Sequence, residues 1–345
     1  MVKILMSSRL FYPSIGGSET DIEVLAHEFT RFGHVIKVVT QTPGSHIDAD
    51  GLKFPFDVIR QPSPAKLFQL VKWCDVYFHN GIILKDAWPL LICRKPWIIR
   101  HQTWIKLPDD IGGNFSGWKA NLKELLVKFS TSISISKSIA EHLPHPSTII
   151  PNPYRDNLFR VIPEIAKTKE FVFLGRLVSD KGVEMLLEAL AELKHQGMMP
   201  QLSIIGSGVE ESKLRQKTND LALAEQVVFL GSKIGEELVQ ILNEHQIMVI
   251  PSLWDEPFGV VALEGIACGC AIVGSEGGGL KDAIGSCGVT FPNGDVKALT
   301  KALFELLTNP DKLSACRRNA ESHLLRHKKA EVAKAYLQVI EAAKK

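Results

Sequence analysis

Two glutamates, Glu256 and Glu264, flank the stretch of this chain whose residue types are best suited to chemistry. The residues between them begin with a proline and a glycine, a pattern typical of the first turn of a helix. At such a start the backbone N–H groups of Phe258 and Gly259 have no partner within the helix, and the helix dipole favours negative charge. The pattern therefore predicts an anion site that suits a phosphate.

The two carboxylates are placed to bind hydroxyl groups on either side of that anion site. Glu264 lies about a turn and a half into the predicted helix, where it can accept hydrogen bonds from the vicinal hydroxyls of a ribose. Glu256, in the loop, can do the same for a sugar beyond the phosphates. An apolar run at residues 246–253 predicts a buried strand before the helix, and open α/β sheets bind ligands at such a junction. We therefore predict a nucleotide-sugar site; two ordinary surface glutamates are the alternative.

This region resembles the donor-site block of the retaining GT-B glycosyltransferases, glycosyltransferase family 4 or group 1. The E-x7-E motif of that family matches Glu256 and Glu264, and its Gly-Gly before an acidic residue matches 278–279 and Asp282. The chain departs from the family in having aspartate at 282 instead of glutamate, and Ala271 where proline is usual. The resemblance covers nearly the whole chain and is densest in its second half.

The segment 171–182 is similar to the G-R-x4-K-G signature of the same family, which implies that Arg176 and Lys181 hold the donor diphosphate. Cleavage of a sugar–phosphate bond leaves charge on the nucleotide diphosphate. Two cations placed there stabilise the transition state more than the ground state. The alternative, a solvated turn, would apply if these residues stood without the preceding strand.

The resemblance also implies donor contacts from backbone positions. The loop at residues 11–19 resembles the family's loop beneath the donor phosphates, and the segment 228–235 resembles the wall of the nucleobase pocket. No G-x-G-x-x-G dinucleotide fingerprint occurs in the chain. The donor-binding positions expected from these segments, besides the charged residues above, are Gly16, Gly17, Gly231, Ile234, Phe258, Gly259 and Val260.

Two histidines end apolar runs in the first half of the chain. His101 closes the run at 96–100, so we expect it to project from the end of a strand into a cleft between domains. The family has a histidine at the matching position, beside the donor sugar and the reacting bond, which makes His101 a catalytic candidate. His79 is better explained as a core histidine. The family also implies a reaction on one face of the sugar, in which the departing phosphate oxygen takes the proton of the acceptor.

Strand and helix patterns alternate through both halves of the 345-residue chain, which predicts parallel, doubly wound sheets and more than one core. We expect a GT-B fold: two Rossmann-like domains facing across a cleft, with the C-terminal helix crossing back. The domains expected are residues 1–152 for the acceptor, a linker at 153–168, and 169–325 for the donor, with 326–345 packing on the first domain. The strands expected are at 4–6, 35–40, 76–79, 97–100, 132–135, 148–150, 171–174, 202–205, 227–230, 247–250, 271–273 and 289–291.

Composition narrows the classes of partner. A net charge of +2 does not suggest a nucleic-acid binder, and no apolar run reaches the ~18 residues of a membrane span. The six cysteines include no C-x-x-C and fit reduced residues of a cytoplasmic protein, and the N-terminus does not resemble a signal peptide.

Asp48 and Asp50 form a D-x-D motif, which in some glycosyltransferases binds a metal ion. Gly51 follows directly, and this favours a turn over a metal site. We expect no cofactor and no metal.

The amphipathic, lysine-containing helix predicted at 115–129 is expected to pack on the core. Peripheral attachment of this helix to the inner face of the membrane is the alternative.

Together these features predict a retaining hexosyltransferase. The expected donor is UDP-glucose, and the expected acceptor is a hydroxyl of a polysaccharide, an oligosaccharide or a lipid-linked sugar in envelope or exopolysaccharide synthesis. A GDP-mannose-dependent mannosyltransferase, a GT-B nucleotide-sugar epimerase and a non-catalytic nucleotide-sugar binding protein are the alternatives. The cleft histidine argues against the last, because a protein that only binds has no need of it.

Overall fold

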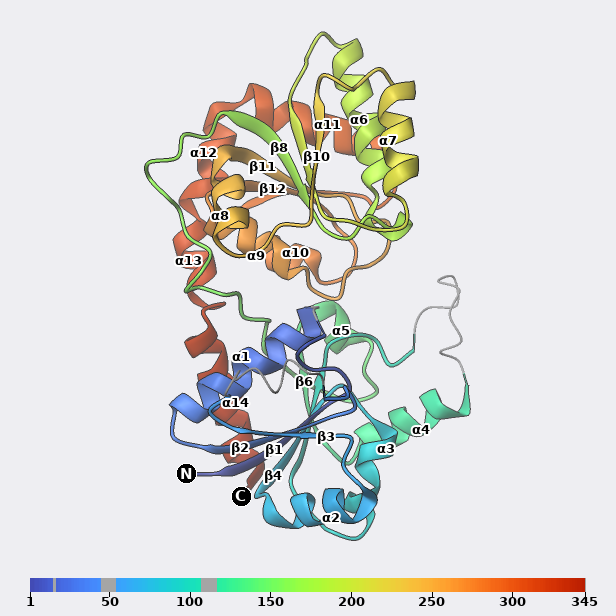
Figure 1. The fold of residues 1–345 in the computed structure, drawn as a ribbon, viewed down its shortest axis with the longest axis vertical. Helices are drawn as coiled ribbons and strands as arrows, with labels where there is room; N and C mark the ends of the chain where they lie inside the picture. The colour runs from blue at the N-terminus through green and yellow to red at the C-terminus, as the bar shows by residue number, and fades with distance from the viewer. Residues whose placement is uncertain (15–16, 45–53, 107–116, 345) are drawn as a thin grey trace. The chain divides into compact units, whose positions relative to one another are not determined.

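The computed structural model describes residues 1–14, 17–44, 54–106 and 117–344. The chain divides into two units (Figure 1). Unit 1 consists of Met1–Pro153 with Lys329–Lys345, and unit 2 is Tyr154–Lys328. Each unit has its own parallel sheet and its own hydrophobic core.

Unit 1 is built on a seven-stranded parallel sheet in the order β3-β2-β1-β4-β5-β6-β7. One face is covered by α1 and α14, whose apolar side chains share a single core cluster (Figure 1). The other face packs against α2 and its neighbours. The elements are β1 (Lys3–Ser8), α1 (Gly17–Arg31), β2 (Val35–Thr40), β3 (Asp57–Arg60), α2 (Pro64–Trp73), β4 (Val76–Asn80), α3 (Leu84–Ala87), η2 (Trp88–Leu91), β5 (Trp97–His101), α4 (Trp118–Val127), β6 (Thr131–Ser134), α5 (Lys137–Glu141), β7 (Thr148–Ile149) and α14 (Lys329–Lys344).

Unit 2 is built on a six-stranded parallel sheet in the order β10-β9-β8-β11-β12-β13. Its main core lies between this sheet and the helices α6, α7, α11 and α12. The elements are β8 (Lys169–Leu174), η3 (Ser179–Lys181), α6 (Val183–His195), β9 (Leu202–Ile205), α7 (Glu211–Asp220), β10 (Val227–Gly231), α8 (Gly235–Glu244), β11 (His245–Ile250), α9 (Val260–Ala267), β12 (Ala271–Ser275), α10 (Leu280–Ile284), β13 (Gly288–Phe291), α11 (Val296–Thr308), α12 (Pro310–Arg318) and α13 (Ala320–Leu325).

These sheets confirm the predicted fold class, including the return of the C-terminal helix to the first half of the chain. The predicted strands omitted β3. The strand β3 pairs with β2 alone, at the edge of the sheet, and its four residues are partly exposed. Its charged ends, one of which pairs with Lys37 at 3.0 Å, hide the apolar pattern that marks a buried strand.

The order of strands in unit 2 places three loops at one edge of the sheet. The strand β11 pairs in parallel with β8 on one side and with β12 on the other. Because carboxyl ends of parallel strands share an edge, the loops that follow these three strands leave the sheet side by side. No helix in the described ranges has both the length and the apolar composition to cross a membrane.

Candidate functional site

The loop after β8 lies directly against the loop after β11. Gly182 has a left-handed φ of 68°, and a Cβ at this position would lie 1.9 Å from the carbonyl oxygen of Pro251. The backbone N–H of Leu253 donates to the carbonyl of Asp180 at 2.9 Å. Only glycine permits this approach, which explains why Lys181 is followed by one. The contact fixes Lys181 above the end of β11.

Lys181 and Glu256, two predicted site residues 75 positions apart, form one cluster. The Nζ of Lys181 lies 2.5 Å from Oε1 of Glu256, and the hydroxyl of Ser252 donates to the same oxygen at 2.7 Å. The side chains of Lys181 and Glu256 are 18% and 11% exposed. Partial burial strengthens charged interactions because water screens them less. The cluster therefore joins a cation that suits a phosphate to a carboxylate that suits a sugar hydroxyl.

The pair of glycines after β12 holds the backbone of Glu256. Gly278 forms a parallel bridge with Glu256, and the N–H of Gly279 donates to the carbonyl of Glu256 at 2.7 Å. Gly278 has a φ of 67°, and a Cβ there would lie 2.2 Å from that carbonyl oxygen. The Asn293 side chain accepts from the N–H of Gly277 at 2.9 Å. The Gly-Gly pattern thus acts through close backbone approach to the predicted sugar-binding glutamate.

The helix α9 begins directly after Gly259, as predicted. Gly259 has a φ of 93° and makes no side-chain capping hydrogen bond, and a Cβ at this position would lie 2.5 Å from Cδ1 of Leu280. Phe258 is buried. Glu264 lies within α9 with its side chain 12% exposed, and an Arg155 guanidinium nitrogen is 3.7 Å from its Oε1. The helix therefore presents free backbone donors at its start and a carboxylate further along.

The other predicted donor residues occupy neighbouring loops of unit 2. Arg176 is exposed at the start of the loop after β8. Gly231 ends β10 with a φ of 69°, and Ile234 is 77% exposed immediately before α8. A hydrogen bond of 2.9 Å between Ser207 and Ser232 ties the loops after β9 and β10 together.

Sequence reasoning missed Ser252, Asn293 and Arg155. Ser252 lies in the same loop as Glu256, four residues before it, which could have suggested a contact. The other two are distant in sequence from the residues that they bind, and no local pattern marks them.

In unit 1, His101 ends β5 and is 2% exposed. Its Nε2 lies 3.0 Å from the hydroxyl of Ser132, and burial lowers its pKa to about 3. His101 is therefore a neutral imidazole near pH 7, able to form hydrogen bonds without carrying a charge. Gly17 begins α1, whereas Gly16 lies outside the described residues.

His79 lies in the core of unit 1. Its ring is 4.4 Å from that of Tyr77 and 5.5 Å from that of Trp97, and neither ring nitrogen has a hydrogen-bond partner among the described residues. Burial lowers the pKa of His79 to about 3. Folding therefore selects the neutral imidazole at this position.

We expect unit 1 to lose stability in mild acid because of His79. Its folded pKa lies below the unfolded value near 6.5, so the unfolded chain binds more protons as the pH falls below about 6.5. Between pH 8 and pH 5 this linkage removes about 2 kcal/mol. Urea unfolding at several pH values should show that His79→Phe reduces the pH dependence by this amount, whereas His195→Gln, at an exposed site, does not. An unchanged pH dependence in His79→Phe would contradict the assignment.

No group of three or more His, Cys, Asp or Glu side chains in the described residues is arranged to hold a metal ion. The predicted turn at Asp48 and Asp50 lies outside those residues.

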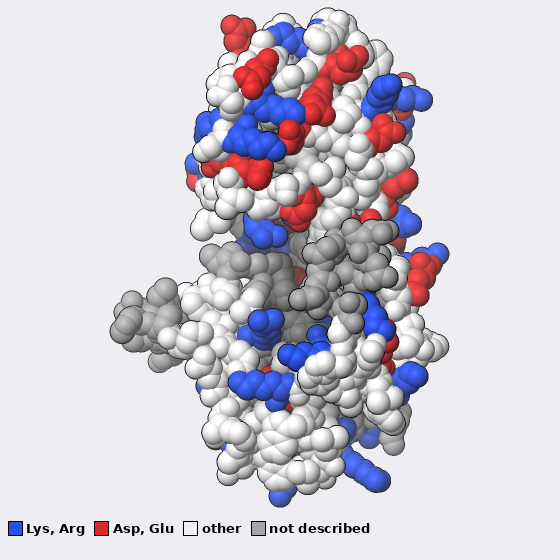
Figure 2. All heavy atoms as spheres, turned by 90° about the vertical axis from the view of Figure 1, so that its right-hand side faces the viewer, with Lys and Arg blue, Asp and Glu red and all other residues white. Residues whose placement is uncertain are grey.

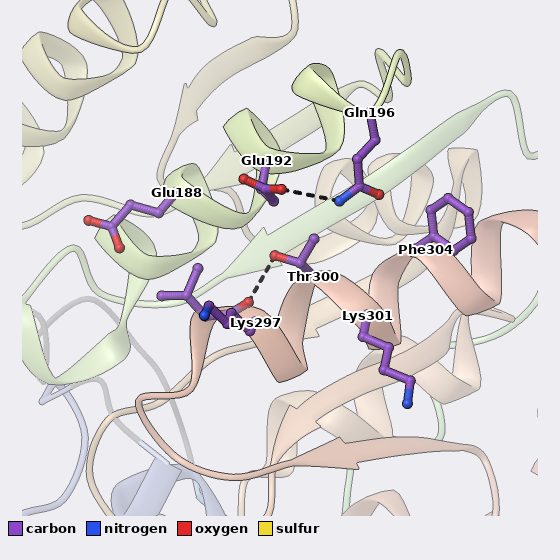
Figure 3. Close-up of a pocket in the computed structure, with 8 residues that line it drawn as sticks. Glu188, Glu192, Gln196, Lys297, Thr300, Lys301 and Phe304 are labelled. Atoms are coloured by element: carbon purple, nitrogen blue, oxygen red, sulfur yellow. Dashed lines mark hydrogen bonds between the residues drawn. The ribbon is translucent and has the colours of Figure 1, made fainter.

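A hollow of about 620 Å³ between α6 and α11 lies apart from the predicted residues (Figure 3). Two of its polar groups bond within their own helices: Gln196 donates to Glu192 at 3.3 Å, and Thr300 to the carbonyl of Val296 at 2.8 Å. Charges of both signs line it. The lining of this hollow therefore does not indicate a class of ligand.

The second half of the chain matches a known sequence family. Residues 155–323 match the model of the family described as glycosyl transferases group 1. A D-inositol 3-phosphate glycosyltransferase of Corynebacterium jeikeium is 34% identical over 166 residues, which are 46% of this chain and 39% of that protein. A GDP-mannose-dependent alpha-(1-6)-phosphatidylinositol monomannoside mannosyltransferase of Mycolicibacterium smegmatis is 31% identical over 199 residues, 54% of this chain and 52% of that protein. The chain thus spans about half or less of the length of these relatives.

Solved structures resemble the chain over nearly its whole length. HepE of Anabaena, in complex with UDP and glucose, matches with a TM-score of 0.80 at 19% identity, covering 99% of this chain and 100% of that one. Sucrose-phosphate synthase from Thermosynechococcus elongatus matches with the same score, identity and coverage. At these identities the likeness shows the fold alone.

Proposed function

We propose that the chain, whose residues 155–323 match the model of the glycosyl transferases group 1 family, is a retaining glycosyltransferase. In this proposal it moves a hexose from a nucleotide diphosphate sugar to an acceptor hydroxyl. Unit 2 binds the donor and unit 1 the acceptor. The observation that carries the proposal is the cluster of Lys181, Glu256 and Ser252 beside the start of α9.

Each charged group of unit 2 has a role in this proposal. Arg176 and Lys181 bind the diphosphate, together with the backbone N–H groups of residues 258–260. Glu264 accepts hydrogen bonds from the ribose, and Glu256 from the donor sugar. In unit 1, His101 is the proposed catalytic histidine, a neutral hydrogen-bonding group.

The proposed reaction needs no protein nucleophile. The bond from the anomeric carbon to the phosphate oxygen breaks, and a bond from the same carbon to the acceptor oxygen forms on the same face. The departing phosphate oxygen takes the acceptor proton. Negative charge grows on the diphosphate as the bond breaks, and Arg176, Lys181 and the start of α9 stabilise it there.

UDP-glucose is the donor we propose, for polysaccharide or lipid-linked acceptors of envelope or exopolysaccharide synthesis. HepE, a structural neighbour, has been crystallised with UDP-glucose. The alternative is GDP-mannose, because the Mycolicibacterium relative depends on it.

Protection against thermal unfolding distinguishes the two donors. A nucleotide sugar at 100 times its dissociation constant should stabilise unit 2 by about 2.7 kcal/mol. We expect protection by UDP-glucose and UDP, much weaker protection by GDP-mannose, and a loss of protection in Glu264→Gln. Glu236→Gln, at an exposed glutamate that pairs with Arg160, is the control and should behave as wild type. Absence of protection by any nucleotide sugar would contradict the proposed function, and selective protection by GDP-mannose would reverse the donor assignment.

A second hollow, in unit 1, supports peripheral attachment to a membrane that carries the acceptor. It measures about 600 Å³ and lies among α3, η2 and α4. Its lining is mostly apolar, with Arg94 and Lys95 as its charged members. Two of its lining residues, Leu91 and Phe129, are 81% and 75% exposed. Figure 2 views the molecule from the side of α4, and Lys and Arg are more prominent than Asp and Glu on the visible part of unit 1. Exposed apolar side chains among cations fit an anionic lipid surface.

We therefore expect the protein to co-sediment with phosphatidylglycerol-containing vesicles and not with pure phosphatidylcholine vesicles. Leu91→Asp should reduce binding at least tenfold, because it puts a negative charge where an apolar side chain enters the interface. Val209→Asp is the control, since it introduces the same charge at an exposed apolar residue of unit 2. Equal binding by Leu91→Asp and wild type would contradict this surface.

A further inference from the structure

The residues that begin unit 2 are tied to its last residues. The N–H of Tyr154 donates to the carbonyl of His327 at 3.1 Å, and Tyr154 forms a parallel bridge with Lys328. The Tyr154 side chain is buried. Arg155 therefore starts from an anchored backbone, although no regular helix or strand contains it.

The Arg155 side chain is directed toward Glu264 of α9. One guanidinium nitrogen lies 3.7 Å from Oε1 of Glu264, and the guanidinium carbon lies 5.3 Å from the centre of the Phe159 ring. Phe159 is buried. A guanidinium over the face of an aromatic ring is attracted by the ring, which helps to hold its charge beside Glu264.

The position of Glu264 creates an electrostatic difficulty that this contact resolves. A carboxylate about a turn and a half from the start of α9 lies near the site proposed for the diphosphate, and two negative groups at short range repel each other. Arg155 approaches the carboxylate with a positive charge, which offsets that repulsion and favours the charged carboxylate that a ribose hydroxyl would bind.

We propose that Arg155 is a positioning residue for donor binding, which acts through Glu264 on the affinity for the nucleotide. This inference rests on the proposed function. It predicts a defect in nucleotide affinity with little change in turnover at saturating donor, because Arg155 contacts neither the sugar nor the reacting bond in the proposal.

Calorimetric titration with UDP, and separately with GDP, tests the role of Arg155. Arg155→Ala should raise the dissociation constant of the nucleotide that wild type binds by about tenfold. Arg155→Lys should recover part of the affinity, because it keeps the charge and loses the planar fork. Arg160→Ala is the matched control: Arg160 lies five residues along and pairs with Glu236 through two contacts of 3.0 and 3.1 Å. The Arg160→Ala variant should bind the nucleotide as tightly as wild type does.

A double-mutant cycle separates positioning from a structural effect. If Arg155 acts through Glu264, the variant Arg155→Ala/Glu264→Gln should bind no more weakly than Glu264→Gln alone. Losses that add, or wild-type affinity in Arg155→Ala, would overturn the inference while leaving the proposed function intact. If wild type binds neither UDP nor GDP, the proposed function fails, and this inference fails with it.

Discussion

Replacement of Lys181 by alanine is expected to lower kcat by about 10²–10³-fold, the loss typical of removing one group that stabilises developing negative charge. In the proposed reaction that charge appears on the leaving diphosphate. Lys181 is held beside Glu256 by the contact between Gly182 and Pro251, and its ammonium is mostly shielded from water. The effect on turnover should therefore exceed the effect on stability.

Lys169→Ala is the matched control for Lys181→Ala. Lys169 lies at the opposite end of β8 and also pairs with a glutamate, Glu244, at 2.6 Å. It should lose no activity. Turnover is measured by release of the nucleoside diphosphate from the donor identified in the protection experiment, and melting temperatures are recorded for each variant. A kcat of Lys181→Ala near that of wild type, or a loss matched by a lowered melting temperature, would remove the diphosphate role.

Gly278→Ala is expected to reduce activity by about 10² or more, although residue 278 contributes no side chain to the site. A methyl group there would lie 2.2 Å from the carbonyl oxygen of Glu256, so one of the two loops must move. Displacement of a catalytic group by about 1 Å is sufficient for a loss of this size. The substitution also imposes the strain of a left-handed residue, about 1–2 kcal/mol.

Gly294→Ala is the control that separates backbone strain from displacement of Glu256. Gly294 has a φ of 78°, and an added Cβ would meet nothing within 4 Å. Both variants carry the strain of a left-handed residue, and Gly278→Ala should lose more stability because of the added clash, but only Gly278→Ala should lose activity beyond what unfolding explains. Equal activity in the two variants would show that the contact between Gly278 and Glu256 does not position the site.

Most strands of the fold could be predicted from the sequence, because a buried parallel strand consists of consecutive apolar residues. Apolar, β-branched runs such as 246–253 predict a strand wherever both faces are covered by helices. The same rule failed for β3, which lies at an edge and carries charged ends. Local patterns also located the start of α9, since Gly259 and the residues around it follow the ordinary preferences of helix termini.

Sequence alone predicted which residues have the chemistry for a donor site and that the strands before them belong to an α/β fold. It could not show that Lys181 and Glu256 share a contact with Ser252, or that Arg155 faces Glu264, because these contacts depend on which strands are neighbours in the sheet. The pairing of β11 with β8 and β12 decides that question. Burial is likewise a tertiary property: only packing against surrounding side chains removes water from His79 and His101 and keeps both rings neutral.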